Sequence, residues 1–367
     1  MNKRILIICN CSSGLNDFRG MLIDELIALN DKVYAIVPPS DLEEELFAEE
    51  QLVARGCELV SIPIDRRGIN PLADIKLFSN YRKEISKIKP DLVITYTIKP
   101  NVYGGVACRL AKIPYAVNIT GLGTAFENDG LLKKIVTIMN KVACKNAKVV
   151  FFENEENRQI FIKERIVRES QTHRLNGAGV NLDKYQVTEY PKGEKIKFLF
   201  MGRVMAEKGI DELFEAMKKL IADGVNCELH VLGGYEEDYK VKIQECENEG
   251  WLHYHGYQKD VRPFIKECHC FVLPSWHEGM ANTNLESAAS GRPVITSNIP
   301  GCLEAVVEGK TGFLVERKNA DDLYRVMKKF TELSYEEQKT MGLAGRKHME
   351  ETFDKKKVVA ETIGSLI

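Results

Sequence analysis

Two cationic residues stand just after an apolar run at the start of the chain's second half. The segment Phe198 to Gly209, FLFMGRVMAEKG, has the pattern of a strand that ends at Gly202, followed by a charged loop and a helix. Glycine permits close approach to the backbone, and the N-terminus of a helix favours anions. Because Arg203 can bind two oxygen atoms and Lys208 one, this segment predicts a clamp for a diphosphate. The alternative is that both side chains are ordinary solvated cations on a loop.

Two glutamates, Glu278 and Glu286, flank the turn and the N-terminus of the short helix expected after the apolar run 270–273. A carboxylate accepts two hydroxyl hydrogen bonds at once, so this pair could hold sugar hydroxyls while backbone amides at the helix start face a phosphate. The alternative is structural. Thr283 and Glu286 have the spacing of a capping box, in which Glu286 would only bond the start of its own helix.

Together these elements resemble the signature of the family 4 retaining glycosyltransferases with the GT-B fold, and the resemblance covers nearly the whole chain. The second-half elements are Gly202-Arg203-x4-Lys208-Gly209, Glu278-x7-Glu286 and Gly291-x-Pro293-Val294-Ile295. In the first half, residues 97–104 and 119–123 resemble the subgroup that makes bacterial capsule, O-antigen and lipid-linked glycans. The resemblance implies an α/β protein with two doubly wound Rossmann-like domains facing a central cleft.

The resemblance also implies a reaction. A hexose or N-acetylhexosamine-type sugar would move, with retention, from a nucleotide diphosphate sugar to a glycan acceptor in surface polysaccharide biosynthesis. UDP is the expected nucleotide, and the expected acceptor is linked to a polyprenyl diphosphate. The nucleotide sugar is itself a substrate, so no cofactor is expected.

The chemistry of the cationic loop agrees with that reaction. Negative charge grows on the leaving diphosphate, and fixed cations aimed at it stabilise the transition state. The chain contains no Asp-x-Asp, the usual carrier of a diphosphate-bound divalent ion, so we expect metal-independent transfer. Front-face attack, in which the departing phosphate takes the acceptor's proton, follows from the resemblance and requires no enzymic nucleophile.

By the same resemblance, Arg203 and Lys208 bind the diphosphate, Glu286 the ribose and Glu278 the donor sugar, and we expect Arg203, Lys208 and Glu278 to be the catalytic residues. The turn at 256–261 resembles the family's nucleobase-facing turn. The remaining donor contacts implied are Gly14, Gly202, Gly233, Lys259, Val261, Gly279, Met280, Ala281 and Asn282.

The acceptor side departs from the family pattern in two places. Many members carry a Gly-Gly pair in the first loop, where this chain has Gly14 alone. Many carry a histidine after the fifth strand, where this chain reads Asn118-Ile-Thr120-Gly121. We therefore expect Asn118 or Thr120 to replace that histidine, with Lys99 nearby.

Alternating apolar runs and helical patterns predict how these residues are positioned. Strands are expected at 5–9, 33–37, 92–95, 115–119 and 149–152, with helices at 18–29, 42–54, 101–111, 131–143 and 155–162. A second series of strands is expected at 197–201, 228–232, 253–254, 270–273 and 294–296. Such alternation is typical of parallel sheets covered by helices on both faces. We expect domains at 1–176 and 177–350, with a C-terminal helix in 351–367 crossing back to the first.

Composition excludes several other classes of protein. A net charge of -2, from 51 basic and 53 acidic residues, gives no field that would attract nucleic acid. Ten cysteines without a Cys-x-x-Cys pair read as buried thiols, and seven scattered histidines predict no metal site. No apolar run is long enough for a signal peptide or a transmembrane helix, so a cytoplasmic protein is expected.

Two basic stretches, 66–89 and 131–148, suggest a membrane surface as a further partner. The second has an apolar stripe and no acidic residue from Gly130 to Lys148. It is either an ordinary surface helix with its stripe in the core, or a device for docking on an anionic membrane that carries the acceptor.

Three other functions remain to be distinguished. Gly121-Leu-Gly123 begins like the fingerprint of a dinucleotide-binding oxidoreductase, but Phe126 stands at the third glycine position. Binding of NAD(P) would support that alternative. A sugar-nucleotide 2-epimerase of the same fold would form product without an acceptor, and a non-catalytic nucleotide-sugar-binding protein would release no nucleotide.

Overall fold

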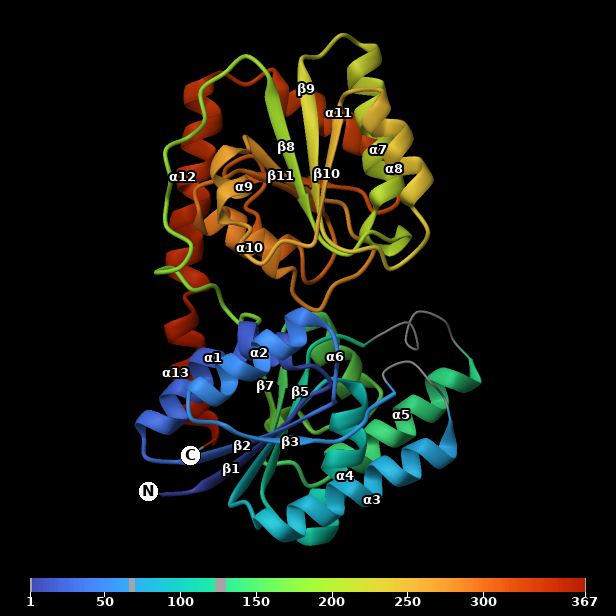
Figure 1. Cartoon of the computed structure of the whole chain (residues 1–367), viewed down its shortest axis with the longest axis vertical. Coiled ribbons are helices and arrows are strands. Elements are labelled where there is room, and N and C mark those ends of the chain that lie inside the picture. The colour runs from blue at the N-terminus through green and yellow to red at the C-terminus, as the bar shows by residue number, and fades with distance from the viewer. Residues whose placement is uncertain (1, 66–69, 123–129, 367) are drawn as a thin grey trace. The chain divides into compact units, whose positions relative to one another are not determined.

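The computed structural model describes residues 2–65, 70–122 and 130–366, which form two compact units (Figure 1). The first unit contains Met1–Ala178 and Lys356–Ile367, and the second contains Gly179–Lys355. The sequence-based limits at 176 and 350 lie a few residues from these. Arg66, Arg67 and the segment 123–126 lie outside the described residues.

The first unit is built on a seven-stranded parallel sheet. Its strand order is β3-β2-β1-β4-β5-β6-β7. The strands are β1 (Arg4–Ile8), β2 (Lys32–Val37), β3 (Glu58–Ser61), β4 (Leu92–Tyr96), β5 (Tyr115–Ile119), β6 (Val149–Phe152) and β7 (Thr172–Arg174). The order of winding reverses between β1 and β4, and the carboxyl ends of strands at such a point are where open α/β sheets bind ligands.

Helices cover both faces of this sheet. One face packs against α1 (Ser12–Ala28), α2 (Glu43–Ala54) and α13 (Lys355–Leu366). The other packs against α3 (Pro71–Ile88), α4 (Gly105–Ala111), α5 (Leu131–Cys144) and α6 (Glu155–Lys163). A single π-helical turn at Pro100–Gly104 leads into α4. Because both faces are buried, the central strands read as continuous apolar runs in the sequence.

The last helix belongs to the first unit although it follows the second in the chain. Val358, Val359 and Leu366 of α13 are buried in the same apolar cluster as the strands of the first sheet. The ammonium group of Lys148 donates a 2.6 Å hydrogen bond to the carbonyl of Leu366. The chain therefore leaves the first unit at Ala178 and returns to it at Lys356.

The second unit repeats the architecture with a six-stranded parallel sheet of order β10-β9-β8-β11-β12-β13. Its strands are β8 (Ile196–Met201), β9 (Cys227–Leu232), β10 (Leu252–Gly256), β11 (Cys270–Leu273), β12 (Val294–Ser297) and β13 (Gly312–Val315). Its helices are α7 (Ile210–Ala222), α8 (Lys240–Asn248), α9 (Arg262–Glu267), α10 (Asn282–Ala289), α11 (Ala320–Thr331) and α12 (Tyr335–Thr352). Here the order of winding reverses between β8 and β11.

Several elements differ from the sequence-based expectation. Helix α1 begins at Ser12, well before the expected residue 18. The strands β3, β7 and β13 were not expected, and all three are short strands at sheet edges. Helix α3 was read only as a basic stretch, since its charged outer face obscures its buried stripe of Leu77, Tyr81, Ile85 and Ile88.

Candidate active site

The loop after β8 is fixed by a close approach between two glycines. The amide of Gly202 donates to the carbonyl of Leu232 over 2.9 Å. Gly233 has a φ of +138°, and a Cβ atom at this position would lie 1.9 Å from the carbonyl oxygen of Gly202. No side chain fits there, so the two glycines hold the backbone in place at the point where Arg203 leaves the sheet.

A third glycine brings this loop onto the segment that follows β11. Gly209 caps α7 in the left-handed region with a φ of +72°, and a Cβ atom there would lie 2.1 Å from the carbonyl oxygen of Pro274. The amide of Trp276 also donates to the carbonyl of Glu207 over 2.9 Å. The loops at the carboxyl ends of β8 and β11 are therefore in direct contact.

This contact unites two of the predicted catalytic residues. The ammonium of Lys208 lies 2.5 Å from Oε1 of Glu278, and their side chains are only 17% and 13% exposed. The hydroxyl of Ser275 donates to the same oxygen over 2.8 Å, a contact that spacing alone did not indicate. An ammonium has three N–H donors, so Lys208 can bind Glu278 and an anionic ligand together.

Arg203 has a different environment. Its side chain is half exposed, and Nη1 lies 3.4 Å from Oε2 of Glu236. Exposed ion pairs of this kind contribute about 1 kcal/mol or less to stability, so a ligand can replace this partner at little cost. Sequence reasoning did not identify Glu236, although it follows the Gly233-Gly234 turn by two residues.

The start of α10 excludes the capping-box interpretation of Glu286. The helix is capped by Ala281, without a side-chain bond, which places Thr283 inside the first turn and Glu286 beyond it. A complete capping box does form elsewhere in the unit, between Ser334 and Glu337. Glu286 is half-buried and follows the N-cap by five positions, whereas a capping box needs a spacing of three.

Residues 279–282 contribute unequally to the site. The side chains of Met280 and Ala281 are buried in the core. The amide of Ala281 donates to the carbonyl of Gly301 over 2.7 Å, so this amide at the helix start is not available to a phosphate. In contrast, Oδ1 of Asn282 is buried and has no hydrogen-bond partner, and a ligand hydroxyl would satisfy it.

The predicted nucleobase-facing turn connects to the same glycines. The amide of Gly233 donates to the carbonyl of Gly256 over 2.8 Å, and the hydroxyl of Tyr254 donates to the carbonyl of Gly233 over 2.8 Å. Lys259 is exposed on this turn, while Val261 is half-buried at the start of α9. The donor residues predicted in the second unit therefore gather at the carboxyl ends of β8, β9, β10 and β11.

In the first unit, the prediction that Gly14 lies in a loop is wrong. Gly14 lies in the first turn of α1, and the amides of Ser12 and Ser13 donate to Oε2 of Glu45 over 2.6 and 3.0 Å. The hydroxyl of Ser13 donates to Oε1 of the same carboxylate over 2.7 Å. Glu45 comes from α2, so a carboxylate of this chain accepts hydrogen bonds from the amides at the N-terminus of α1, a position that favours anions.

Lys99 and Thr120 line one small cavity of about 260 Å³ at the reversal point of the first sheet. Its wall also includes Asn10, Ile64, Thr97, Ile98 and Gly121. The ammonium of Lys99 binds Oδ1 of Asp74 over 2.8 Å. Thr97 has a φ of +72° and a buried hydroxyl without a partner, a combination that is rare for a β-branched residue and concentrates at binding sites.

Asn118 does not reach this cavity as a substrate contact. It is buried within β5, where Nδ2 donates to the carbonyl of Thr95 over 3.2 Å. Its own carbonyl accepts a 2.7 Å hydrogen bond from Nδ2 of Asn101. The structure thus gives Asn118 a role in joining β5 to β4, and of the two alternatives, Asn118 and Thr120, only Thr120 lines the cavity.

Both units match models of known protein families. Residues 28–154 match the family described as glycosyl transferase 4-like, and residues 183–348 match glycosyl transferases group 1. A Campylobacter jejuni N,N'-diacetylbacillosaminyl-diphospho-undecaprenol alpha-1,3-N-acetylgalactosaminyltransferase is 28% identical over 87% of this chain and 87% of that protein. An Escherichia coli UDP-Gal:alpha-D-GlcNAc-diphosphoundecaprenol alpha-1,3-galactosyltransferase is 29% identical over 74% of each.

A solved structure supports the fold. Anabaena HepE, crystallised with UDP and glucose, superposes with a TM-score of 0.80 at 16% identity, and the match covers 99% of this chain and 100% of HepE. This similarity, like the two parallel sheets, is that of a GT-B protein.

Proposed function

Since this chain belongs to the glycosyltransferases with the GT-B fold, we propose that it transfers a sugar from a UDP-sugar to a lipid-diphosphate-linked glycan, with retention and without a metal ion. The names of the two relatives support this proposal. One uses UDP-Gal, and both act on a sugar linked to undecaprenol through a diphosphate.

The observation that carries the proposal is the contact between Lys208 and Glu278 at the reversal point of the second sheet. In the proposed complex, Lys208 and Arg203 bind the donor diphosphate, and Glu278 accepts hydroxyls of the sugar. Both cations come from a loop fixed by Gly202, Gly209 and Gly233, so they need little rearrangement as charge develops on the leaving group. Each charge-assisted contact contributes about 1.5–3 kcal/mol.

We place the acceptor's polar headgroup in the cavity lined by Thr97, Lys99 and Thr120. The cavity offers one cation and two hydroxyl groups, one of which is buried without a partner. These groups suit the oxygen atoms of a glycosyl diphosphate. Glu45 at the start of α1 keeps the neighbouring helix terminus closed to a second anion.

The third part of the proposal is peripheral docking on an anionic membrane. Exposed apolar side chains lie on three of the four helices that cover one face of the first sheet, namely Leu72 and Ile75 of α3, Leu110 of α4, and Ile135, Ile138 and Val142 of α5. Exposed lysines accompany them at positions 76, 134, 141 and 145. Among the described helices, none is both long enough and apolar enough to cross a bilayer.

The docking proposal is tested with anionic liposomes at low salt. We expect the protein to sediment with them, and the double variant Ile135→Ser, Ile138→Ser to remain in the supernatant. Leu343→Ser, which changes an exposed leucine of the second unit, is the matched control. If the unmodified protein stays in the supernatant, docking is wrong.

The transfer itself is tested with a panel of UDP- and GDP-sugars and a synthetic polyprenyl-diphosphate sugar. We expect release of UDP that depends on the acceptor, with the α-anomer formed from an α-linked donor. Product formed without acceptor would indicate an epimerase. Binding of UDP-sugars without release from any acceptor would indicate a non-catalytic binding protein.

A further inference from the structure

Three of the seven histidines, together with a glutamate, lie on two neighbouring strands of the second unit. His230 on β9 and His253 on β10 are paired in the parallel register. Glu228 precedes His230 by two residues, and side chains two apart in a strand share a face of the sheet. The spacing of residues 228, 230 and 253 along the sequence is typical of no metal motif. For this reason the histidines were read as scattered, and no metal site was predicted from the sequence.

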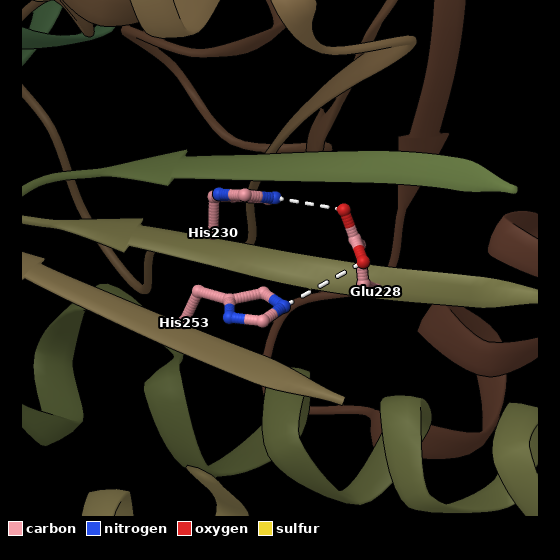
Figure 2. A group of neighbouring side chains, drawn as sticks. All are labelled: Glu228, His230 and His253. Atoms are coloured by element: carbon pink, nitrogen blue, oxygen red, sulfur yellow. Dashed lines mark hydrogen bonds and ion pairs between the residues drawn. The ribbon is translucent and has the colours of Figure 1, made fainter. Parts of the chain in front are cut away.

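The two imidazoles converge on one carboxylate, as Figure 2 shows. Nε2 of His230 lies 3.1 Å from Oε1 of Glu228, and Nε2 of His253 lies 3.5 Å from Oε2. One ligand atom from each of the three residues lies within 4.8 Å of the others. Tetrahedral coordination with bonds of about 2.0–2.1 Å separates neighbouring ligands by about 3.3 Å.

We propose that Glu228, His230 and His253 form a binding site for Zn²⁺, with water as the fourth ligand. Two imidazole nitrogens and a carboxylate oxygen are donors that Zn²⁺ accepts, whereas Mg²⁺ prefers oxygen ligands alone. The imidazole-to-carboxylate distances of 3.1 and 3.5 Å are close to the ligand separation of tetrahedral coordination. Because they end on different oxygens of Glu228, a rotation of the carboxylate or of the His253 ring is needed to bring all three ligands onto one ion. The imidazole of His253 is 45% exposed, which leaves a path for the ion and the water.

His255 supports the ligand arrangement. Its Nε2 lies 2.9 Å from Nδ1 of His230, and the two rings are stacked within 2° of parallel. A hydrogen bond to the second ring nitrogen sets the tautomer and orientation of a metal-bound histidine. His255 thus acts as a positioning residue, since it holds His230 with Nε2 directed to the ion.

Two lysines compete with the ion for Glu228. The ammonium of Lys195 lies 2.6 Å from Oε2, and that of Lys197 lies 3.8 Å from Oε1. Lys195 is 44% exposed, so its ammonium can move into solvent when the ion binds. Lys195→Met removes this competitor from a carboxylate that is only 9% exposed, so it is expected to tighten zinc binding by about twofold or more.

A zinc ion bound by Glu228, His230 and His253 would link the edge strand β10 to its neighbour β9. The strand β10 leads directly to the turn after Gly256, which is bonded to Gly233 of the proposed donor site. The proposed ligands lie before the carboxyl ends of their strands and are distinct from Lys208 and Glu278. Zinc would therefore stabilise the second unit without taking part in the transfer.

The test uses the full chain, freed of metal with a chelator and titrated with ZnCl₂ by calorimetry and thermal unfolding. We expect one zinc ion per chain and a rise in Tm, and no rise with MgCl₂. His253→Gln is expected to weaken binding more than about 100-fold, and His255→Gln about 10- to 100-fold. The matched control is His173→Gln, which removes a histidine of the first unit that lies 2.8 Å from Glu361.

The Tm of His253→Gln in the absence of zinc shows whether that variant is folded, and we expect it to lie within a few degrees of the unmodified chain. Equal zinc affinity for the unmodified chain and His253→Gln would overturn the proposal. So would the lack of any zinc-dependent rise in Tm in the unmodified chain.

Discussion

Replacing Lys208 by methionine separates the catalytic role of the Lys208–Glu278 pair from its structural role. Removal of one partner of a buried ion pair costs about 3–5 kcal/mol, because the other charge stays buried without compensation. Here the Ser275 hydroxyl still donates to Glu278 and both side chains retain some exposure, so we expect a loss of about 2 kcal/mol. The lost contact with the diphosphate lowers kcat/KM by about 10- to 150-fold.

The double variant Lys208→Met, Glu278→Gln distinguishes the two effects. With both charges removed, the free energy of unfolding in urea is expected to return to within about 1 kcal/mol of the unmodified chain. Activity, followed as UDP release, is expected to stay low because the cation is still missing. Lys218→Met, at an exposed pair with Glu249, is the control for removing a lysine and changes neither quantity appreciably. Recovery of kcat/KM together with stability in the double variant would show that Lys208 serves only to neutralise Glu278.

Three further substitutions test other parts of the second unit. Arg203→Ala is expected to lower turnover about 100-fold while the Tm changes little, since the side chain is half exposed. A loss of stability as large as the loss of turnover would show that Arg203 has a structural role. Arg292→Met is expected to lower the free energy of unfolding in urea by about 3–5 kcal/mol, because this fully buried guanidinium donates to the Thr188 hydroxyl and to several main-chain carbonyls. A decrease below about 1 kcal/mol would contradict this role of Arg292. Burial lowers the pKa of His269 from 6.5 to about 4. Between these two pH values the folded chain therefore binds fewer protons than the unfolded chain, and the stability of the fold decreases as the pH drops from 6.5 towards 4. His269→Asn keeps an acceptor for the Lys197 amide, and its Tm should depend less on pH in that window; an unchanged pH dependence would refute the assignment.

The positions of the predicted donor residues in the second unit could be inferred from the local sequence. Arg203, Lys208 and Glu278 each follow an apolar run, and parallel strands carry their ligand-binding residues at the carboxyl ends. Their positions could therefore be inferred without knowing which strands are neighbours. What was missing was the strand order, which places β8 beside β11 and brings Lys208 to Glu278.

Some expectations failed because they depended on distant partners. Gly14 was assigned to a loop because the sequence does not show that Glu45, from another helix, closes the start of α1. Asn118 was read, with Thr120 as the alternative, as a substrate contact because its partners, Thr95 and Asn101, lie on other elements. In both cases a polar group is satisfied by a residue many positions away, and no local pattern records such a pairing.

The sequence by itself determined the fold class, the family and the positions of the cationic loop and the two glutamates. The fold class and these positions follow from residue type and from periodicity over about ten residues, which act locally, whereas the family follows from the resemblance of the motifs. Only the tertiary structure decided which residues meet, as with Lys208 and Glu278, the cavity of Thr97 and Lys99, and the cluster of Glu228, His230 and His253. The physical reason is that strand order and register bring together side chains that no spacing along the chain relates.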